Sequence, residues 1–121
     1  MSRVTFAVLV AAVLAALAVL APAQAMTKPK LTGTVGPGFT ITLKQGTKSV
    51  KTLRAGSYTI KVTDKGDIHN FHLIGPGVNK KTGVSSTSAQ TWTVKLRAGK
   101  YTFQCDPHAT SGMRGTFKVT S

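Results

Sequence analysis

One short segment near the C-terminus carries three side chains that could bind a metal, namely Cys105, His108 and Met113. Their spacing is Cys-x2-His-x4-Met, and a second imidazole is available upstream at His69. Two histidines, one cysteine and a weakly bound axial methionine form the ligand set of a blue-copper electron-transfer centre. Cys105 is the only cysteine in the chain. It therefore has no partner for an internal disulfide, and metal binding explains it best.

Other sites and reactions fit these residues less well. Structural zinc prefers four Cys or His ligands, whereas the fourth candidate here is a thioether. A nucleophilic Cys–His pair needs an exposed thiolate and a third group that orients the histidine, and the nearest carboxylate, Asp106, is adjacent to the thiol instead. A multicopper oxidase domain would need histidines beside the cysteine, and a dinuclear copper centre would need a second cysteine. Copper storage would favour many Met or Cys. We therefore expect no enzymatic activity.

The residues after Ala25 alternate between apolar and polar types almost throughout, which is typical of half-buried β-strands. Such alternation covers residues 39–43, 58–63, 91–96, 101–105 and 116–119. Turn signals rich in glycine separate these runs, and no stretch has a convincing helical period. Many short strands with regular turns predict an all-β sandwich.

Two further patterns concern the turns and loops. The segment 53–60 (LRAGSYTI) is echoed by 96–103 (LRAGKYTF), which predicts two equivalent corners where a glycine turn leads into a strand with an inward tyrosine. The segment 75–90 is rich in Gly, Ser, Thr, Asn and Lys. We expect it to form a crossover loop between the sheets, attached to the core by Val78 and Val84.

Strand alternation also indicates which histidine can meet the thiol. Cys105 falls on the inward phase of its strand, and His69 falls on the same phase as the core-like Phe71. His72 falls on the opposite face together with Asn70. Because successive side chains in a strand point to opposite faces, we expect His69 rather than His72 to be the upstream ligand.

The order His69-Asn70, a strand, Cys105-x-Pro107-His108-x4-Met113 and a last strand resembles the cupredoxins, with a loop spacing similar to that of plastocyanin and pseudoazurin. The resemblance covers most of residues 31–121. It implies a Greek-key β-sandwich with one type 1 copper ion at one end. It also implies two histidines and the cysteine as equatorial ligands, with the methionine as the axial ligand. These are His69, His108, Cys105 and Met113.

The same resemblance implies that the backbone N–H of Asn70 donates to the Cys105 sulfur, and that the Asn70 side chain ties the two loops together. Pro107 has no N–H to donate to that sulfur, and its ring stiffens the ligand loop. We expect the ring edge of His108 to reach the surface. Around it, residues 36–38 and 75–77 with Pro107 and Ala109 are expected to form an uncharged docking patch. The acidic patch of plant plastocyanins is absent.

The first 25 residues predict a helical secretory signal peptide rather than part of the domain. Arg3 gives a positive start, residues 4–21 are apolar apart from Thr5, and Pro22 precedes the small-residue pattern 23–25. These are the parts of a cleavable export signal, although an uncleaved membrane anchor is the alternative. We expect cleavage near Ala25, export to the periplasm or the extracellular face, and a monomeric copper-binding domain over residues 26–121.

The chain is strongly basic, with a net charge of +13, or +12 without Arg3. Such a surface attracts anionic partners. We expect redox protein partners of acidic character, or loose attraction to an anionic membrane or wall polymer. Nucleic acid is not expected, because no recognition motif is present. The predicted function is one-electron transport by blue copper. The alternatives are a non-redox module for copper delivery or sequestration, and a basic wall-binding domain with an incidental site.

Overall fold

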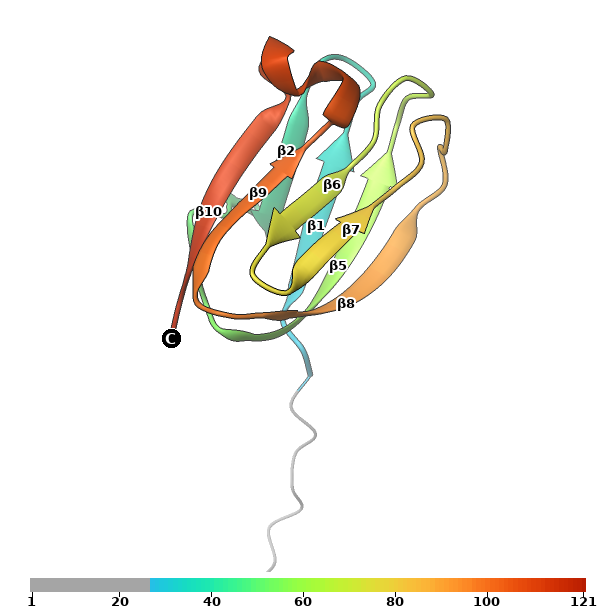
Figure 1. The fold of residues 1–121 in the computed structure, drawn as a ribbon. Helices are drawn as coiled ribbons and strands as arrows, with labels where there is room; N and C mark the ends of the chain where they lie inside the picture. Colours follow the sequence, from blue (N-terminus) through green and yellow to red (C-terminus); the bar gives the residue numbers. More distant parts are fainter. Residues whose placement is uncertain (1–26) are drawn as a thin grey trace, which may run out of the picture.

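The computed structural model describes residues 27–121, so the predicted signal peptide and its cleavage site lie outside the described residues. The described chain forms ten β-strands and one short 3-10 helix, η1 (Figure 1). In chain order the elements are β1 (Lys30–Val35), β2 (Ile41–Gln45), β3 (Lys48–Ser49), β4 (Thr52–Arg54), β5 (Gly56–Asp64), β6 (His72–Gly75), β7 (Val78–Lys81), β8 (Gln90–Leu96), β9 (Gly99–Gln104), η1 (Asp106–Ser111) and β10 (Arg114–Thr120). Among residues 27–121, no helix is long and apolar enough to cross a membrane.

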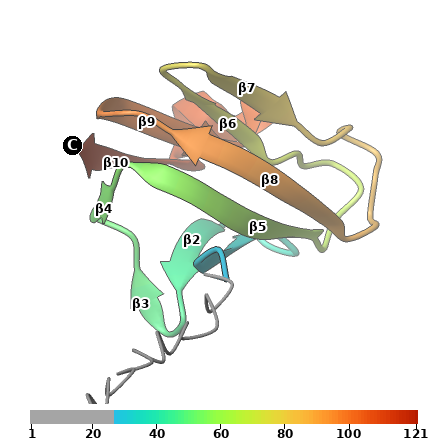
Figure 2. The same ribbon diagram turned by 90° about the horizontal axis from the view of Figure 1, so that it is seen from below.

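The strands form two five-stranded sheets that pack face to face. One sheet has the order β3-β2-β1-β5-β8, and the other has the order β4-β10-β9-β6-β7. Seen from below, the two sheets form two layers (Figure 2). Neighbouring strands are antiparallel except for the pairs β1–β5 and β10–β4. The predicted all-β sandwich is therefore confirmed.

The core is built by the inward phase of the predicted strands. In β5, β8, β9 and β10 the buried side chains alternate with exposed or half-buried ones. The sequence predicted these buried positions: Tyr58, Ile60, Val62, Trp92, Val94, Leu96, Tyr101, Phe103, Phe117 and Val119. The alternation determines which side chains are buried, because only one face of each sheet packs against the other sheet.

Two expectations about loops were wrong in part. Phe39 was expected to begin an inward strand, but β2 begins at Ile41 and the Phe39 side chain is 62% exposed. The predicted crossover loop contains a short edge strand, β7. Its Val78 is buried as expected, whereas Val84 is 41% exposed and does not attach the loop to the core.

The repeated LRAG segments form two equivalent corners, as predicted. Each corner joins one sheet to the other, β4 to β5 and β8 to β9. The leucines, Leu53 and Leu96, are buried. The glycines, Gly56 and Gly99, have φ of +152° and +144°, a backbone conformation that favours glycine.

The two inward tyrosines close these corners. The Tyr58 hydroxyl donates to the Arg54 carbonyl at 2.7 Å. The Tyr101 hydroxyl lies 3.1 Å from the Arg97 carbonyl and 2.9 Å from the Pro76 carbonyl, and it accepts from the Arg97 N–H at 3.0 Å. Each tyrosine hydroxyl thus bonds to the carbonyl of the arginine four residues before it.

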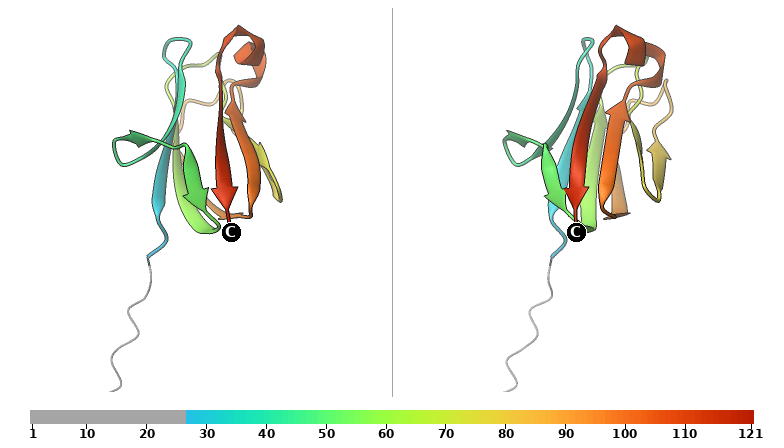
Figure 3. Two further views of the ribbon diagram at one scale, coloured as in Figure 1. Left: turned by 90° about the vertical axis from the view of Figure 1, so that its left-hand side faces the viewer. Right: turned by 60° about the vertical axis from the view of Figure 1, so that its left-hand side comes forward.

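These contacts define two ends of the sandwich, which we call the copper end and the corner end. The copper end holds the loops 36–40, 65–71, 82–89 and 105–113, together with η1. The corner end holds both tyrosine corners, the start of β1 and the C-terminus (Figures 1 and 3). Because Pro76 bonds to Tyr101, the segment 75–77 lies at the corner end. Its expected place in a docking patch around His108 was wrong.

Candidate metal centre

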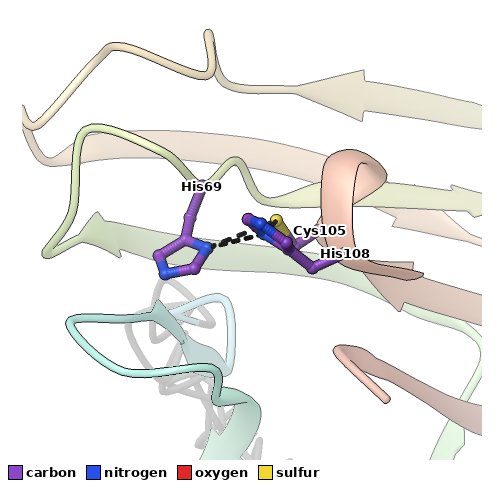
Figure 4. Close-up of side chains that lie close together, drawn as sticks. All are labelled: His69, Cys105 and His108. Atoms are coloured by element: carbon purple, nitrogen blue, oxygen red, sulfur yellow. Dashed lines mark hydrogen bonds between the residues drawn. The ribbon is translucent and has the colours of Figure 1, made fainter. Parts of the chain in front are cut away.

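Three loops at the copper end bring together the side chains predicted to bind metal. Cys105 directly follows β9, and His108 lies on η1 three residues later. His69 comes from the loop between β5 and β6. Figure 4 shows its imidazole pointing toward Cys105 and His108. The fold thus joins residues that are more than thirty positions apart in the chain.

The three donor atoms lie at distances that suit one shared ion. The Nδ1 atoms of His69 and His108 are 3.1 Å apart. The Cys105 Sγ lies 3.6 Å from His69 Nδ1 and 3.4 Å from His108 Nδ1. Donors bound to one ion at about 2.0–2.3 Å, with angles of about 100–120°, are separated by roughly 3.1–3.8 Å. The observed triangle fits that range without rearrangement.

Burial and chemistry of the donors favour a soft metal. Cys105 and His69 are fully buried, and His108 is half-buried. Met113 is also fully buried. Its carbonyl accepts from the Cys105 N–H at 3.0 Å, and its N–H donates to the His108 carbonyl at 3.2 Å. A thiolate with two imidazoles and a thioether from the same loop is a donor set that selects copper over magnesium, calcium or manganese.

Two glycines make room for the His69 ring. A Cβ added at either Gly36 or Gly66 would lie 3.0 Å from His69 Cδ2. Gly36 also has φ +73°, which favours glycine on its own account. The imidazole is therefore held between two loops, with its Nδ1 edge toward the thiol.

A buried carboxylate, Asp64, lies close enough to His69 for the two groups to interact electrostatically. His69 Nε2 and Asp64 Oδ2 are the buried side-chain N or O atoms that have no hydrogen-bond partner among the described residues. Burial raises the pKa of Asp64, while the Gly66 amide, which donates to Oδ1 at 3.0 Å, and the His69 imidazole oppose that rise. Ligating histidines usually donate their second ring N–H to such a group or to water.

Asp106 is the centre of a hydrogen-bond network that sequence reasoning missed. Its carboxylate accepts from Asn70 Nδ2 and Gln104 Nε2, each at 2.9 Å, and lies 2.8 Å from His72 Nδ1. Its N–H donates to Asn70 Oδ1 at 2.7 Å. Partial burial alone would raise the pKa of Asp106, but these hydrogen bonds lower it to about 2. The side chain of Asn70 thus ties the two loops, as the resemblance implied.

The other contact implied for Asn70 is absent from the described residues, since no hydrogen bond joins its backbone N–H to the Cys105 sulfur. Asn70 is also buried, although strand alternation placed it outward with His72. The reason is that β6 begins only at His72, so residues 69–71 follow a loop path on which three successive side chains are buried.

His72 lies outside the triangle of donors. It is half-buried, and its Nε2 lies 2.6 Å from Asn79 Oδ1 while its Nδ1 faces Asp106. A cluster of metal-ligating groups at this end contains His69, Cys105 and His108 without it. The outward phase of His72 was therefore deduced correctly, because it is the first residue of a regular strand.

Phe39 is a second contact of the site that the sequence did not predict. Its ring meets the His108 ring edge to face, with centroids 4.9 Å apart, and the His69 ring in the same way at 5.5 Å. Alternation suggested a core position for it, and no motif marked it as part of the site. An exposed aromatic ring thus covers both imidazoles.

Comparisons with known proteins agree with this geometry. Residues 34–120 match the family model described as copper binding proteins, plastocyanin/azurin family. A rusticyanin structure has a TM-score of 0.57 at 21% identity, covering 75% of this chain and 76% of that chain. A reduced auracyanin from the photosynthetic bacterium Roseiflexus castenholzii has a TM-score of 0.56 at 17% identity, covering 79% and 100%. At these identities the structures support the fold alone. No curated protein sequence matches significantly.

Proposed function

This chain belongs to the plastocyanin/azurin family of copper-binding proteins, and from that premise we propose that it is an exported, non-enzymatic carrier of single electrons. The cupredoxin resemblance is confirmed by the family match, and the cofactor is one type 1 copper ion. When bound, copper supplies reversible one-electron chemistry. The residues of the chain supply the ligands, their rigidity and the access route.

The observation that carries this proposal is the triangle of Cys105 Sγ and two histidine Nδ1 atoms, which lie 3.1–3.6 Å apart. Hydrogen bonds hold the loops that carry these atoms. The Cys105 carbonyl accepts from the His108 N–H at 3.1 Å, and its N–H donates to the Met113 carbonyl at 3.0 Å. Asp106 and Asn70 then join this loop to the one that holds His69. A frame of this kind keeps the ligands in place when the charge at the site changes, which favours fast electron exchange.

We expect electrons to enter and leave the site through His108, because it is the one equatorial candidate that is not fully buried. Phe39 contacts its ring, and further apolar side chains are exposed at the same end. Phe39, Ile68 and Val84 are 62%, 50% and 41% exposed, and all three lie in loops of the copper end. We propose that a redox protein docks on this apolar surface. An acidic character of that partner stays a prediction.

Copper delivery or sequestration remains the competing function. A delivery protein should release its metal on a change of oxidation state, whereas a carrier should keep it. Cyclic voltammetry of the copper-loaded protein decides between them. Repeated reversible one-electron cycles without loss of copper support the carrier, and release of metal on reduction supports delivery.

Export rests on residues 1–25, whose composition is that of a signal peptide. The test is N-terminal mass determination of the protein recovered outside the cytoplasm. A chain that begins at Met26 is the expected result. A chain that keeps residues 1–25 would favour the membrane anchor instead.

A further inference from the structure

The charges of this molecule are divided between its two ends. All three acidic residues lie at the copper end, where β5 finishes and in the two ligand loops: Asp64, Asp67 and Asp106. The remainder of the domain carries no acid. Within residues 27–121, moreover, no Lys or Arg forms an ion pair. Lys65 and Arg114 lie at the copper end with the acids, so the excess of positive charge lies on the sheets and at the corner end.

The repeated corners contain one residue that the fold does not explain. Burial accounts for their leucines, positive φ for their glycines, and the hydroxyl contacts for their tyrosines. From Arg54 and Arg97 the corner uses only backbone groups, which any residue would supply. Both side chains are exposed, and that of Arg97 lies over Gly77. Two equivalent corners thus present two arginines at one end.

Neighbouring lysines strengthen this charge at a cost to stability. Lys100 and Lys118 are directly opposite each other on β9 and β10, and both are exposed. Like charges in such a cross-strand pair destabilise a sheet. Arg54 lies opposite Thr120, two positions farther along the same strand as Lys118. An anion outside the chain would relieve the repulsion within such a cluster.

The chain enters the domain at the same end. A hollow of about 610 Å³ there is lined by residues of the entering segment and of the first corner, including Lys28 and Arg54. In the sequence the apolar run ends at Ala21, seven residues before Lys28. Seven residues span at most about 25 Å. While the apolar run is in a bilayer, before cleavage or as an anchor, the corner end must therefore stay near the lipid headgroups.

We propose that the corner end is a docking surface for anionic phospholipid headgroups, and that it holds the domain with its copper end facing away from the membrane. The residues that form it are Lys28, Arg54, Arg97, Lys100 and Lys118. Basic residues near an anionic bilayer each contribute about 1 kcal/mol, so five are enough for binding that depends on salt. The proposal needs no copper. Only its consequence, an outward electron port, rests on the proposed function.

The test is co-sedimentation of the full chain with vesicles of phosphatidylcholine, with and without phosphatidylglycerol. The difference between the two lipids removes the contribution of the apolar run, which is the same in every variant. Three double variants each lose two positive charges: Arg54→Gln with Arg97→Gln, Lys100→Gln with Lys118→Gln, and, as a control at the copper end, Lys65→Gln with Arg114→Gln.

We expect each corner-end variant to lower the preference for phosphatidylglycerol vesicles by about 30-fold, which corresponds to two charges at about 1 kcal/mol each. The copper-end control should change it much less. The lysine variant should at the same time unfold at a slightly higher temperature, because a repulsive pair is removed. Weaker lipid binding with higher stability separates a docking role from a structural one.

Equal losses in all three variants would mean that only net charge acts, and they would overturn the proposal. A larger loss in the copper-end control would place the opposite face on the membrane. Unchanged binding in both corner-end variants would also overturn it, and the basic residues would then serve a soluble polyanion or solubility. Because the apoprotein gives the same readout, failure of this proposal is distinguishable from failure of the redox function.

Discussion

The copper end and the corner end are held together by different kinds of contact. At the copper end the structure depends on particular side chains, since a thiol and two imidazoles come together and Asp106 joins their loops. At the corner end the structure depends on backbone groups, since the Tyr58 and Tyr101 hydroxyls bond to carbonyl groups and two glycines have positive φ. Substitutions at one end should change spectra and potential, and those at the other should change stability.

The two ends also differ in surface chemistry. The copper end exposes apolar side chains and carries all the acids of the chain. The corner end is basic and has no acidic side chain. Most of the positive charge therefore lies away from the proposed electron port, and steering of an acidic redox partner would be less direct than the net charge suggests. The difference agrees with the two proposals made above, electron exchange at one face and membrane attachment at the other.

The largest effect is expected from Cys105→Ser. A serine hydroxyl does not ionise as a thiol does and is a harder donor, so copper–thiolate bonding is lost. The intense visible band should vanish and Cu(II) affinity should drop by orders of magnitude. Circular dichroism should still show a β-protein. A variant that stays intensely blue would remove Cys105 from the site.

The next effect separates the two upstream histidines. His69→Ala should open the site, so that added imidazole restores colour, because the Nδ1 beside Cys105 is lost. His72→Ala should keep the visible band, since the hydrogen-bond partners that it loses are Asp106 and Asn79, which are not ligands. Absorption titrations with imidazole measure both. Rescue of His72→Ala rather than His69→Ala by imidazole would reverse the assignment.

The corner end is tested by a matched pair of tyrosines. Tyr101→Phe should lower the free energy of unfolding by about 1–3 kcal/mol, because partly buried carbonyl groups and an N–H lose their partner. Tyr58→Phe removes one hydrogen bond and should cost about 0.5–1.5 kcal/mol. Urea unfolding measures the difference. The visible band should be unchanged in both, and a shifted band would show that the two ends are coupled.

Met113→Leu should change the potential more than the affinity. A weak axial donor stabilises Cu(II), so its loss should raise the reduction potential while copper remains bound and coloured. The swap nearly conserves volume and should cost less than about 1.5 kcal/mol of stability. Voltammetry beside the wild type gives the shift. Complete loss of copper would make Met113 a principal ligand instead.

The smallest effect concerns the Asp106 network in the apoprotein. The pKa of Asp106 is about 2 in the folded chain, against about 3.9 in an unfolded one. Its stabilising contribution is therefore complete above about pH 4 and is lost as the pH falls toward 2. Asp106→Asn should lack this part of the acid destabilisation. Parallel unfolding curves for variant and wild type between these pH values would show that the network does not stabilise the fold.

Most of the sheet could be predicted from the sequence because its inner and outer residues differ in polarity. The prediction failed where a strand lacks that contrast. In β1, Gly33 is needed because a Cβ there would lie 2.7 Å from the Phe71 ring, and a glycine inside a strand weakens the sequence signal. In β7 only Val78 is apolar, because the strand forms the edge of its sheet.

Residue types and strand alternation were enough to predict one part of the site. Cys105 and His69 are brought together because both lie on inward positions at the same end of the sandwich. Contacts between loops could not be deduced in this way. The partners of Asp106 come from three different segments, and Phe39 covers the histidines from a turn, where alternation has no meaning.

The central claim is tested most directly by the visible spectrum of the purified protein during one redox cycle. After addition of one equivalent of Cu(II), we expect an intense band from copper–thiolate bonding. The band should disappear on addition of one electron per copper and return fully on oxidation, with the metal still bound. A pale protein, or one that loses copper on reduction, would contradict the assignment of a blue-copper electron carrier.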